Sequence, residues 1–255
     1  MSKQVETLKK ELNEMYRTAF ENCEKCNYEH CGIHKTSYKD KIKYDYAAHL
    51  GEKYGEGKYK VLFVGKEGLK HHEEVDKTQS ILNTKPNNKH YLGTIYTLAL
   101  LNDKKPESMK LNDLKEYENI HKQFCLTNYF KCAFLEENDD TQKVRGLPGN
   151  TYMKDHCYEI LIKEIEILKP DLVIIQGKFT TKPFWDALDE EHKAKLLYKN
   201  AKISLYKYTL KNRTFCVLWS YHPASSDWSG TLQDFIKAIN AFKEDFAKNE
   251  SENAL

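Results

Sequence analysis

The sequence has no run of apolar residues long enough to cross a membrane, and its N-terminus has no apolar stretch of the kind found in signal peptides. A membrane-spanning helix requires about 18 or more consecutive apolar residues. Internal repeats and low-complexity segments are absent as well. We therefore expect a cytoplasmic protein with no membrane-embedded segment.

The sequence also has no strong excess of charge, since 40 Lys and Arg residues face 38 Asp and Glu residues and the formal net charge is +2. That balance neither requires nor excludes a nucleic-acid partner, because the placement of charges matters more than their sum. Of the 255 residues, 40% are hydrophobic and 12% aromatic, which is enough to bury a full-sized core. We expect a monomer with a single domain over residues 1–255.

The sequence has seven cysteines, and an odd number in a cytoplasmic chain argues against a framework of disulfides. Cys125 and Cys216 lie in the apolar runs "FCL" and "FCVLW" and are expected to be small core residues. The remaining cysteines lie in polar surroundings: Cys23, Cys26, Cys31, Cys132 and Cys157. These five require another explanation.

The hydrophobic pattern alternates between two kinds of segment. Apolar runs that predict buried strands cover 60–65, 123–128 and 171–177, and a β-hairpin is expected from 202–210 and 214–220. Apolar or amphipathic segments predict helices at 3–21, 93–101, 154–168, 180–188 and 231–246. Strands that alternate with helices predict an α/β fold of three layers, α/β/α, around a central, mainly parallel sheet of four strands.

Ligands bind to such sheets at the carboxyl ends of the strands. At those ends the sequence has "GKEG" for the strand 60–65, "NYFKC" for 123–128, "GKFT" for 171–177 and "SYHPASS" for 214–220. We expect the functional residues among these four segments.

Cys23 and Cys26 form a Cys-x-x-Cys pair, whose spacing lets two thiolates reach one metal centre from a single turn. Cys132 and Cys157 flank a long loop, and Cys157 begins a predicted helix, where the helix dipole favours a thiolate. Four thiolates from three segments could hold zinc or a 4Fe–4S cluster. The alternatives are that these thiols are unrelated, or that Cys31 replaces Cys23 or Cys26 as a ligand.

Seven segments follow one another along the chain: "NCEKC", "VLFVGKEG", "HYLGTIYTLALL", "LTNYFKC", "RGLPGNT", "CYEILIKEIEILKPDLVIIQGK" and "SYHPASS". This ordered set resembles the uracil-DNA glycosylase superfamily, in particular its iron–sulfur branch, family 4 and its relatives. "LTNYFKC" is similar to the family's Thr-Asn-x-x-Lys-Cys, and "SYHPASS" to its His-Pro-Ser motif. The resemblance favours a 4Fe–4S cluster over zinc, held by Cys23, Cys26, Cys132 and Cys157.

By this resemblance, Asn128 reads the edge of a uracil that has flipped out of the DNA, because a carboxamide offers the donor and the acceptor that suit N3–H and O4. Tyr91 corresponds to the aromatic residue that stacks on the base. His222 corresponds to the histidine that stabilises negative charge on the uracil O2 as the glycosidic bond breaks. Without the resemblance, Asn128 would be a strand-end turn residue, Tyr91 a packed side chain and His222 a loop histidine.

The resemblance also implies DNA contacts after the strands. Lys131 corresponds to a residue that faces the DNA backbone, and Ser225 and Ser226 follow the histidine, where they could contact phosphates. Lys66, Lys131 and Lys178 all follow predicted strands, so we expect them to share the rim of one cleft.

The family's first motif, Gly-Glu-Ala-Pro-Gly, is altered in this sequence. It corresponds to "GKEGL", in which Gly65 and Lys66 begin the pocket-lining loop, a lysine replaces the glutamate and the proline is missing. Glu67 could position the attacking water after a shift of one residue. Other candidate bases follow closely, unless they are a solvated helix turn: His71, His72, Glu73 and Glu74.

These observations predict an enzyme, a DNA glycosylase that hydrolyses the N-glycosidic bond of uracil or a related deaminated base in DNA. The first alternative is a non-catalytic module that binds a base, nucleotide or nucleic acid in the same pocket, with hydrolysis lost through the altered motif. The second alternative is a zinc-stapled α/β protein unrelated to nucleic acid.

Overall fold

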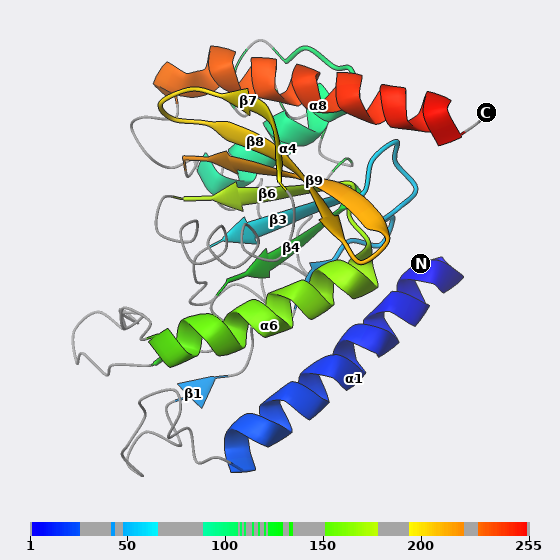
Figure 1. Ribbon diagram of the computed structural model, residues 1–255, viewed down its shortest axis with the longest axis vertical. Helices are drawn as coiled ribbons and strands as arrows, with labels where there is room; N and C mark the ends of the chain where they lie inside the picture. The colour runs from blue at the N-terminus through cyan, green and yellow to red at the C-terminus, as the bar shows by residue number, and fades with distance from the viewer. Residues whose placement is uncertain are drawn as a thin grey trace.

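The computed structural model is built around one mixed β-sheet with helices on both faces (Figure 1). It describes residues 2–25, 42–43, 48–65, 89–106, 108, 110, 114, 117, 120, 122–129, 133–134, 151–177, 194–221 and 229–253. Among the helices in these ranges, none has both the length and the apolar character that a membrane crossing requires.

The sheet has seven strands in the order β2-β4-β3-β6-β9-β8-β7. They are β2 (His49–Leu50), β3 (Val61–Gly65), β4 (Phe124–Asn128), β6 (Leu172–Gln176), β7 (Lys195–Lys199), β8 (Ser204–Leu210) and β9 (Arg213–Ser220). The central strands β4, β3, β6 and β9 run parallel, whereas β2, β8 and β7 are antiparallel to their neighbours. A separate antiparallel pair joins β1 (Ile42–Lys43) to β5 (Ala133–Phe134).

The expected sheet of four strands is too small, because antiparallel strands extend the parallel centre on both sides. The predicted hairpin is confirmed as β8 and β9. The sequence does not predict β2 and β7, since β2 has two residues and β7 has no fully buried position. Neither strand therefore shows the apolar pattern by which buried strands are recognised.

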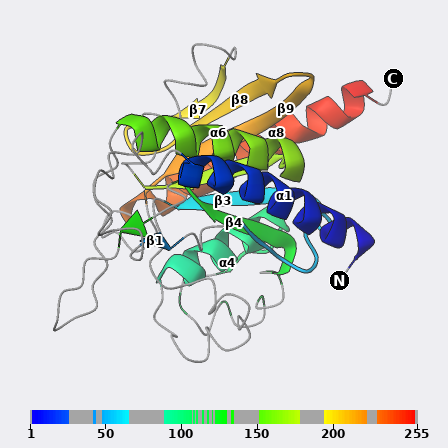
Figure 2. The same cartoon turned by 90° about the horizontal axis from the view of Figure 1, so that it is seen from below.

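Helices cover both faces of the sheet (Figure 2), in agreement with the expected α/β class and its three layers. On one face are α1 (Lys3–Lys25) and α6 (Thr151–Leu168), and on the other are α4 (Lys89–Leu101) and α8 (Leu232–Asn253), which follows the short helix η5 (Ser229–Thr231). The helix expected at 180–188 lies outside the described residues.

The central strands are buried on both faces because their successive side chains point to opposite sides of the sheet. In β3, Leu62 and Val64 pack in the core cluster that includes α1 and α6, whereas Val61 and Phe63 pack in the one that includes α4 and α8. This double burial explains why the parallel strands appear in the sequence as nearly continuous apolar runs.

The two cysteines predicted to be core residues are buried, Cys125 in β4 and Cys216 in β9. Burial raises the pKa of the Cys216 thiol to about 12, so this thiol stays protonated at neutral pH. Both observations confirm the prediction that these cysteines serve packing.

Candidate functional site

The four parallel strands end in one row of residues at the edge of the sheet where ligands bind in α/β proteins. Asn128 of β4 pairs with Gly65 of β3, and Gln176 of β6 pairs with Ser220 of β9. The pairing of β3 with β6 makes Gly65 and Gln176 the next neighbours. We call these four residues the terminal row, and the alternation along each strand places all of them on the face covered by α4 and α8.

The carboxamide of Asn128 occupies space that Gly65 leaves open. A Cβ atom on Gly65 would lie 2.8 Å from Oδ1 of Asn128, closer than real Cβ atoms approach other atoms. The next residue, Tyr129, is buried, and its backbone N–H donates to the carbonyl of Gly65 at 2.8 Å. The end of β4 is therefore held against β3, and the half-buried Asn128 carboxamide stays at the sheet edge.

A comparable arrangement holds the other half of the terminal row. Gly177 follows Gln176 with a φ of 122°, a conformation that favours glycine. Its N–H donates to the carbonyl of Ser220 at 3.0 Å, and its own carbonyl accepts from Nε1 of Trp219 at 3.2 Å. Gln176 itself is only 2% exposed, so its side chain is fixed beneath the surface of this edge.

A buried hydrogen-bond network supports the terminal row from the opposite face of the sheet. Thr127, which precedes Asn128, donates through its hydroxyl to Glu164 of α6, at 3.1 Å to Oε1 and 3.0 Å to Oε2. The hydroxyl of Tyr16 in α1 donates to the same Oε1 and accepts from the backbone N–H of Ala48 at 2.7 Å. Glu164 is fully buried, so α1, α6 and β4 are joined through one carboxyl group.

The protonation of Tyr16 suits this network. Burial, followed by the proximity of Glu164, raises the pKa of Tyr16 well above its ordinary value. The phenol therefore keeps its proton at physiological pH and remains a hydrogen-bond donor.

Two of the predicted cluster ligands lie at one end of the α1–α6 pair. The two helices run in opposite directions (Figure 1), and Tyr16 meets Glu164 where they pack together. Cys23 is seven residues after Tyr16 in α1, and Cys157 is seven residues before Glu164 in α6. Seven residues of helix span about 10 Å, or roughly two turns. Because the helices are antiparallel, Cys23 and Cys157 are both displaced by this distance from the Tyr16–Glu164 contact in the same direction, toward the edge that carries the terminal row. The prediction that Cys157 begins a helix in polar surroundings is wrong, because α6 already starts at Thr151 and Cys157 is buried in the core cluster that includes α1 and α6.

Most of the other predicted site residues lie outside the described residues. They are Cys26, Cys31, Lys66, Glu67, His71, His72, Glu73, Glu74, Lys131, Cys132, Lys178, His222, Ser225 and Ser226. Tyr91 lies in the first turn of α4. In the ranges that are described, no group of three or more His, Cys, Asp or Glu side chains could hold a metal ion.

The family model of the uracil DNA glycosylase superfamily matches residues 52–243 of the chain. The protein belongs to this superfamily. The match includes all four parallel strands and the terminal row, and it begins after α1. The resemblance noted in the sequence is thereby confirmed at the level of the superfamily, while the iron–sulfur branch stays a prediction. None of the curated proteins matches the chain.

Sequence reasoning missed two polar residues of this superfamily member, Glu164 and Gln176. Glu164 lies on the inward face of α6, three residues after Leu161 and next to Ile165, both of which are buried. Gln176 ends the otherwise apolar run "LVIIQ". In both cases the signal is a polar side chain at a position that the hydrophobic period assigns to the core, where it requires hydrogen-bond partners.

Proposed function

We propose that this superfamily member is a DNA glycosylase, which hydrolyses the N-glycosidic bond of uracil or a related deaminated base in DNA. The observation that carries the proposal is the Asn128 carboxamide, held over Gly65 at the ligand-binding edge of a sheet that belongs to this superfamily. A base inside a duplex cannot present its pairing edge to such a group, so the target nucleotide must be single-stranded or flipped out of the helix.

Recognition of the base follows from the chemistry of a fixed amide. The carboxamide of Asn128 offers an acceptor to the N3–H of uracil and a donor to its O4. The backbone hydrogen bond from Tyr129 to Gly65 holds the end of β4 in place before the base arrives, which lowers the entropic cost of binding. Tyr91 lies in the first turn of the helix α4, which covers the face on which Asn128 lies, and this placement supports its assignment as the stacking residue.

Hydrolysis adds water to C1′ of the deoxyribose and breaks the bond between C1′ and the base nitrogen, whose electron pair leaves with the base. Negative charge then develops on the base, in uracil partly on O2. We assign His222, two residues after Ser220 of the terminal row, as the donor to that oxygen. We assign Glu67, two residues after Gly65, as the group that orients the water and accepts its proton.

We further propose that Cys23, Cys26, Cys132 and Cys157 hold a 4Fe–4S cluster, with Cys31 as the alternative to Cys23 or Cys26. The antiparallel packing of α1 and α6 supports this, because it brings Cys23 and Cys157 to one end of the pair. When bound, such a cluster needs no redox role and joins these segments beside the DNA-binding edge.

The cluster assignment predicts about four irons per chain in anaerobically purified protein. Replacing Cys157 by Ala should bleach the protein and lower its thermal stability. The same substitution at Cys125 is the control, since it removes a buried thiol without removing a proposed ligand. Stoichiometric zinc without iron would contradict the assignment.

We assign the contacts to the DNA backbone to five residues that follow the strand ends: Lys66, Lys131, Lys178, Ser225 and Ser226. Each cation that neutralises a phosphate should lower the binding constant by roughly 0.7–0.9 log units per tenfold increase in salt. Binding that does not depend on salt would argue against these contacts.

The test of the proposed reaction is to incubate anaerobically purified protein with single-stranded DNA that contains one uracil and to measure abasic sites. Asn128→Ala should weaken both binding and cleavage. Asn212→Ala is the matched control, because Asn212 is an exposed asparagine in the turn between β8 and β9, at the opposite edge of the sheet. If the wild-type protein cleaves no deaminated base, the glycosylase proposal fails.

The altered first motif supports a second candidate, a module that binds a base or nucleotide without hydrolysing it. Lys66 replaces the glutamate that would line the pocket, and the proline of the motif is missing. In that case DNA binding should persist without cleavage. Restoring Gly-Glu-Ala-Pro-Gly over residues 65–69 would then be the way to recover hydrolysis.

A further inference from the structure

The terminal row contains a second side-chain amide, that of Gln176, which lies one strand away from Gly65 and two from Asn128. Both amides lie on the same face of the sheet, since each is the last residue of a parallel strand in the same register. Adjacent strands are about 4.8 Å apart, so one small planar molecule bound at this edge between the two amides could reach both.

The side-chain carbonyl of Gln176 has no hydrogen-bond partner within the described part of the chain. Its register neighbour Ser220 does not serve it, because the Ser220 hydroxyl donates to the carbonyl of Tyr221 at 3.2 Å. Gly65, on the other side, has no side chain. A buried acceptor without a donor destabilises a folded protein, and such groups call for a functional or ligand-based explanation.

The position of Gln176 is also fixed in advance. Gly177, the next residue, is hydrogen-bonded to Ser220 through its N–H and to Trp219 through its carbonyl. Asn128 is held in the same way, through the bond between Tyr129 and Gly65. A preorganised and unpaired acceptor at a ligand-binding edge is what a recognition site requires.

We propose that Gln176 is a second base-contacting amide, whose Oε1 accepts a hydrogen bond from a ring N–H that Asn128 does not read. The inference rests on the proposed function, since it assumes that Asn128 reads a nucleobase, and it names a specificity-determining residue of that site.

The chemistry of the bases then selects the substrate. Uracil attached through N1 has one ring N–H, at N3, and hypoxanthine attached through N9 has one, at N1. Xanthine, formed by deamination of guanine, has two in its neutral form, at N1 and N3. Its N3–H is acidic in the nucleoside, so binding is compared in mildly acidic buffer, where N3 keeps its proton. A pocket with two amide acceptors therefore accommodates xanthine with a hydrogen bond that uracil and hypoxanthine cannot make, because a site that offers an acceptor favours the base that brings a donor.

The two roles of Gln176 predict opposite effects of Gln176→Met on stability. If Gln176 served only to stabilise the fold, the substitution would lower the melting temperature. If its carbonyl is kept for a ligand, the substitution should leave the melting temperature unchanged or raise it, because Met has a similar length and shape but lacks the unpaired carbonyl. A residue that lowers stability and improves recognition is typical of a functional site.

The experiment measures binding to single-stranded DNA that carries one 2′-fluoro nucleotide of uracil, hypoxanthine or xanthine, in which the glycosidic bond resists cleavage. Gln176→Met should weaken binding of the xanthine DNA by about tenfold, the value of one hydrogen bond, and leave binding of the uracil DNA within about twofold. The matched control is Gln123→Met, because Gln123 lies just before β4, at the opposite edge of the sheet.

The same three bases in ordinary DNA report cleavage in parallel. If no base is cleaved while Gln176→Met still selectively weakens xanthine binding, the glycosylase proposal fails and the assignment of Gln176 stands. If uracil is cleaved and Gln176→Met changes binding of all three DNAs equally or of none, the assignment of Gln176 is wrong and the glycosylase proposal stands. Failure of the wild-type protein to distinguish xanthine DNA from DNA with no deaminated base overturns the assignment as well.

Discussion

At the amino edge of the parallel sheet, charged side chains are paired with one another, whereas the carboxyl edge ends in the terminal row, with small and neutral polar residues. At the amino edge, Asp171 accepts from the backbone N–H of Lys60 at 2.8 Å and from Nη2 of Arg213 at 3.2 Å. The same Nη2 donates to the carbonyl of Pro170 at 3.0 Å. Charged groups here join the starts of β6 and β9 and the residue before β3.

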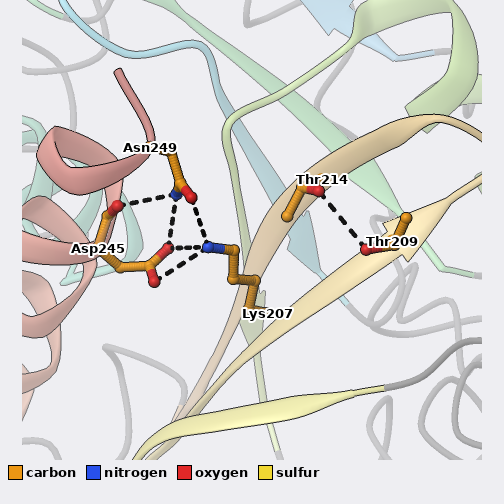
Figure 3. Close-up of polar contacts among 5 residues, drawn as sticks. All are labelled: Lys207, Thr209, Thr214, Asp245 and Asn249. Atoms are coloured by element: carbon orange, nitrogen blue, oxygen red, sulfur yellow. Dashed lines mark hydrogen bonds and ion pairs between the residues drawn. The ribbon is translucent and has the colours of Figure 1, made fainter. Parts of the chain in front are cut away.

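The amino edge also borders a cavity of about 420 Å³, yet its charges are compensated. Nζ of Lys207 lies 2.8 Å from Oδ2 of Asp245 and donates to Oδ1 of Asn249 at 2.8 Å (Figure 3). Nδ2 of Asn249 donates in turn to Oδ2 of Asp245 at 3.0 Å. Nη1 of Arg213 has no partner in the described residues, but the charge of that guanidinium is balanced by Asp171. The comparison teaches that a cavity alone does not identify a site: the charged groups beside this cavity are paired with one another, and the proposed recognition residues lie at the other edge.

The largest effect is expected at the carboxyl edge, from His222→Ala. The single-turnover rate of uracil release should fall by roughly 10²–10³, the usual effect of losing one donor to a developing oxyanion. Binding to uncleavable DNA should stay within about twofold, because this donor acts mainly in the transition state. The melting temperature should not change. If His222→Ala lowered stability as strongly as it lowered the rate, the proposal that the carboxyl edge serves catalysis and the amino edge serves stability would be contradicted.

A somewhat smaller effect is expected for Glu164→Ala, which removes the acceptor of both Tyr16 and Thr127. The free energy of unfolding should fall by about 3 kcal/mol in a denaturant titration, since two buried donors lose a partner and a cavity forms. Base binding should weaken as well, because Thr127 is adjacent to Asn128. Glu159→Ala, an exposed glutamate on the same helix, is the control and should change neither quantity.

At the amino edge, Lys207→Met should lower the free energy of unfolding by about 2 kcal/mol, because Asp245 would lose its cation at a site where both side chains are largely buried. DNA binding should not change. Thr209→Ala is the matched control on the same strand, since its contact with Thr214 at 3.5 Å is exposed. A loss of DNA binding in Lys207→Met would show that this edge also takes part in recognition.

The smallest effect concerns Cys216 and pH. Burial, and then the proximity of Asp245, raises the pKa of this thiol to about 12, whereas an unfolded chain releases the proton near pH 8.5. Because the folded state keeps the proton, stability should fall as pH rises above about 8.5, by about 1 kcal/mol between pH 8 and 9.5. Cys216→Val should lack this part of the alkaline slope. If the free energy of unfolding fell equally with pH in the wild-type protein and in Cys216→Val, the raised pKa of Cys216 would not explain the alkaline loss of stability.

Local pattern predicted the regular elements well, because strands buried on both faces and helices with one apolar face leave clear periodicities. The position of Asn128 at the end of β4 could be predicted too, since it lies in a short motif at a strand end. The supporting network could not: Tyr16 reaches Glu164 across 148 positions, and Thr127 reaches it across 37. Such pairings are decided by how helices pack on a sheet, and no local pattern encodes them. The strand β7 was missed for a different reason. It is an edge strand without a fully buried position, so its sequence does not have to show the apolar pattern of a buried strand.

The helix α1 has a consequence for where this protein can be shortened. It precedes the stretch matched by the superfamily, yet Val5 and Leu12 are buried in the same cluster as α6, and Tyr16 completes the Glu164 network. A chain that started at residue 52 would keep every strand of the parallel sheet but would present the apolar flank of α6 and a buried carboxyl group to water. The stretch matched by the superfamily, residues 52–243, is thus shorter than the part of the chain that packs into one core, which includes α1.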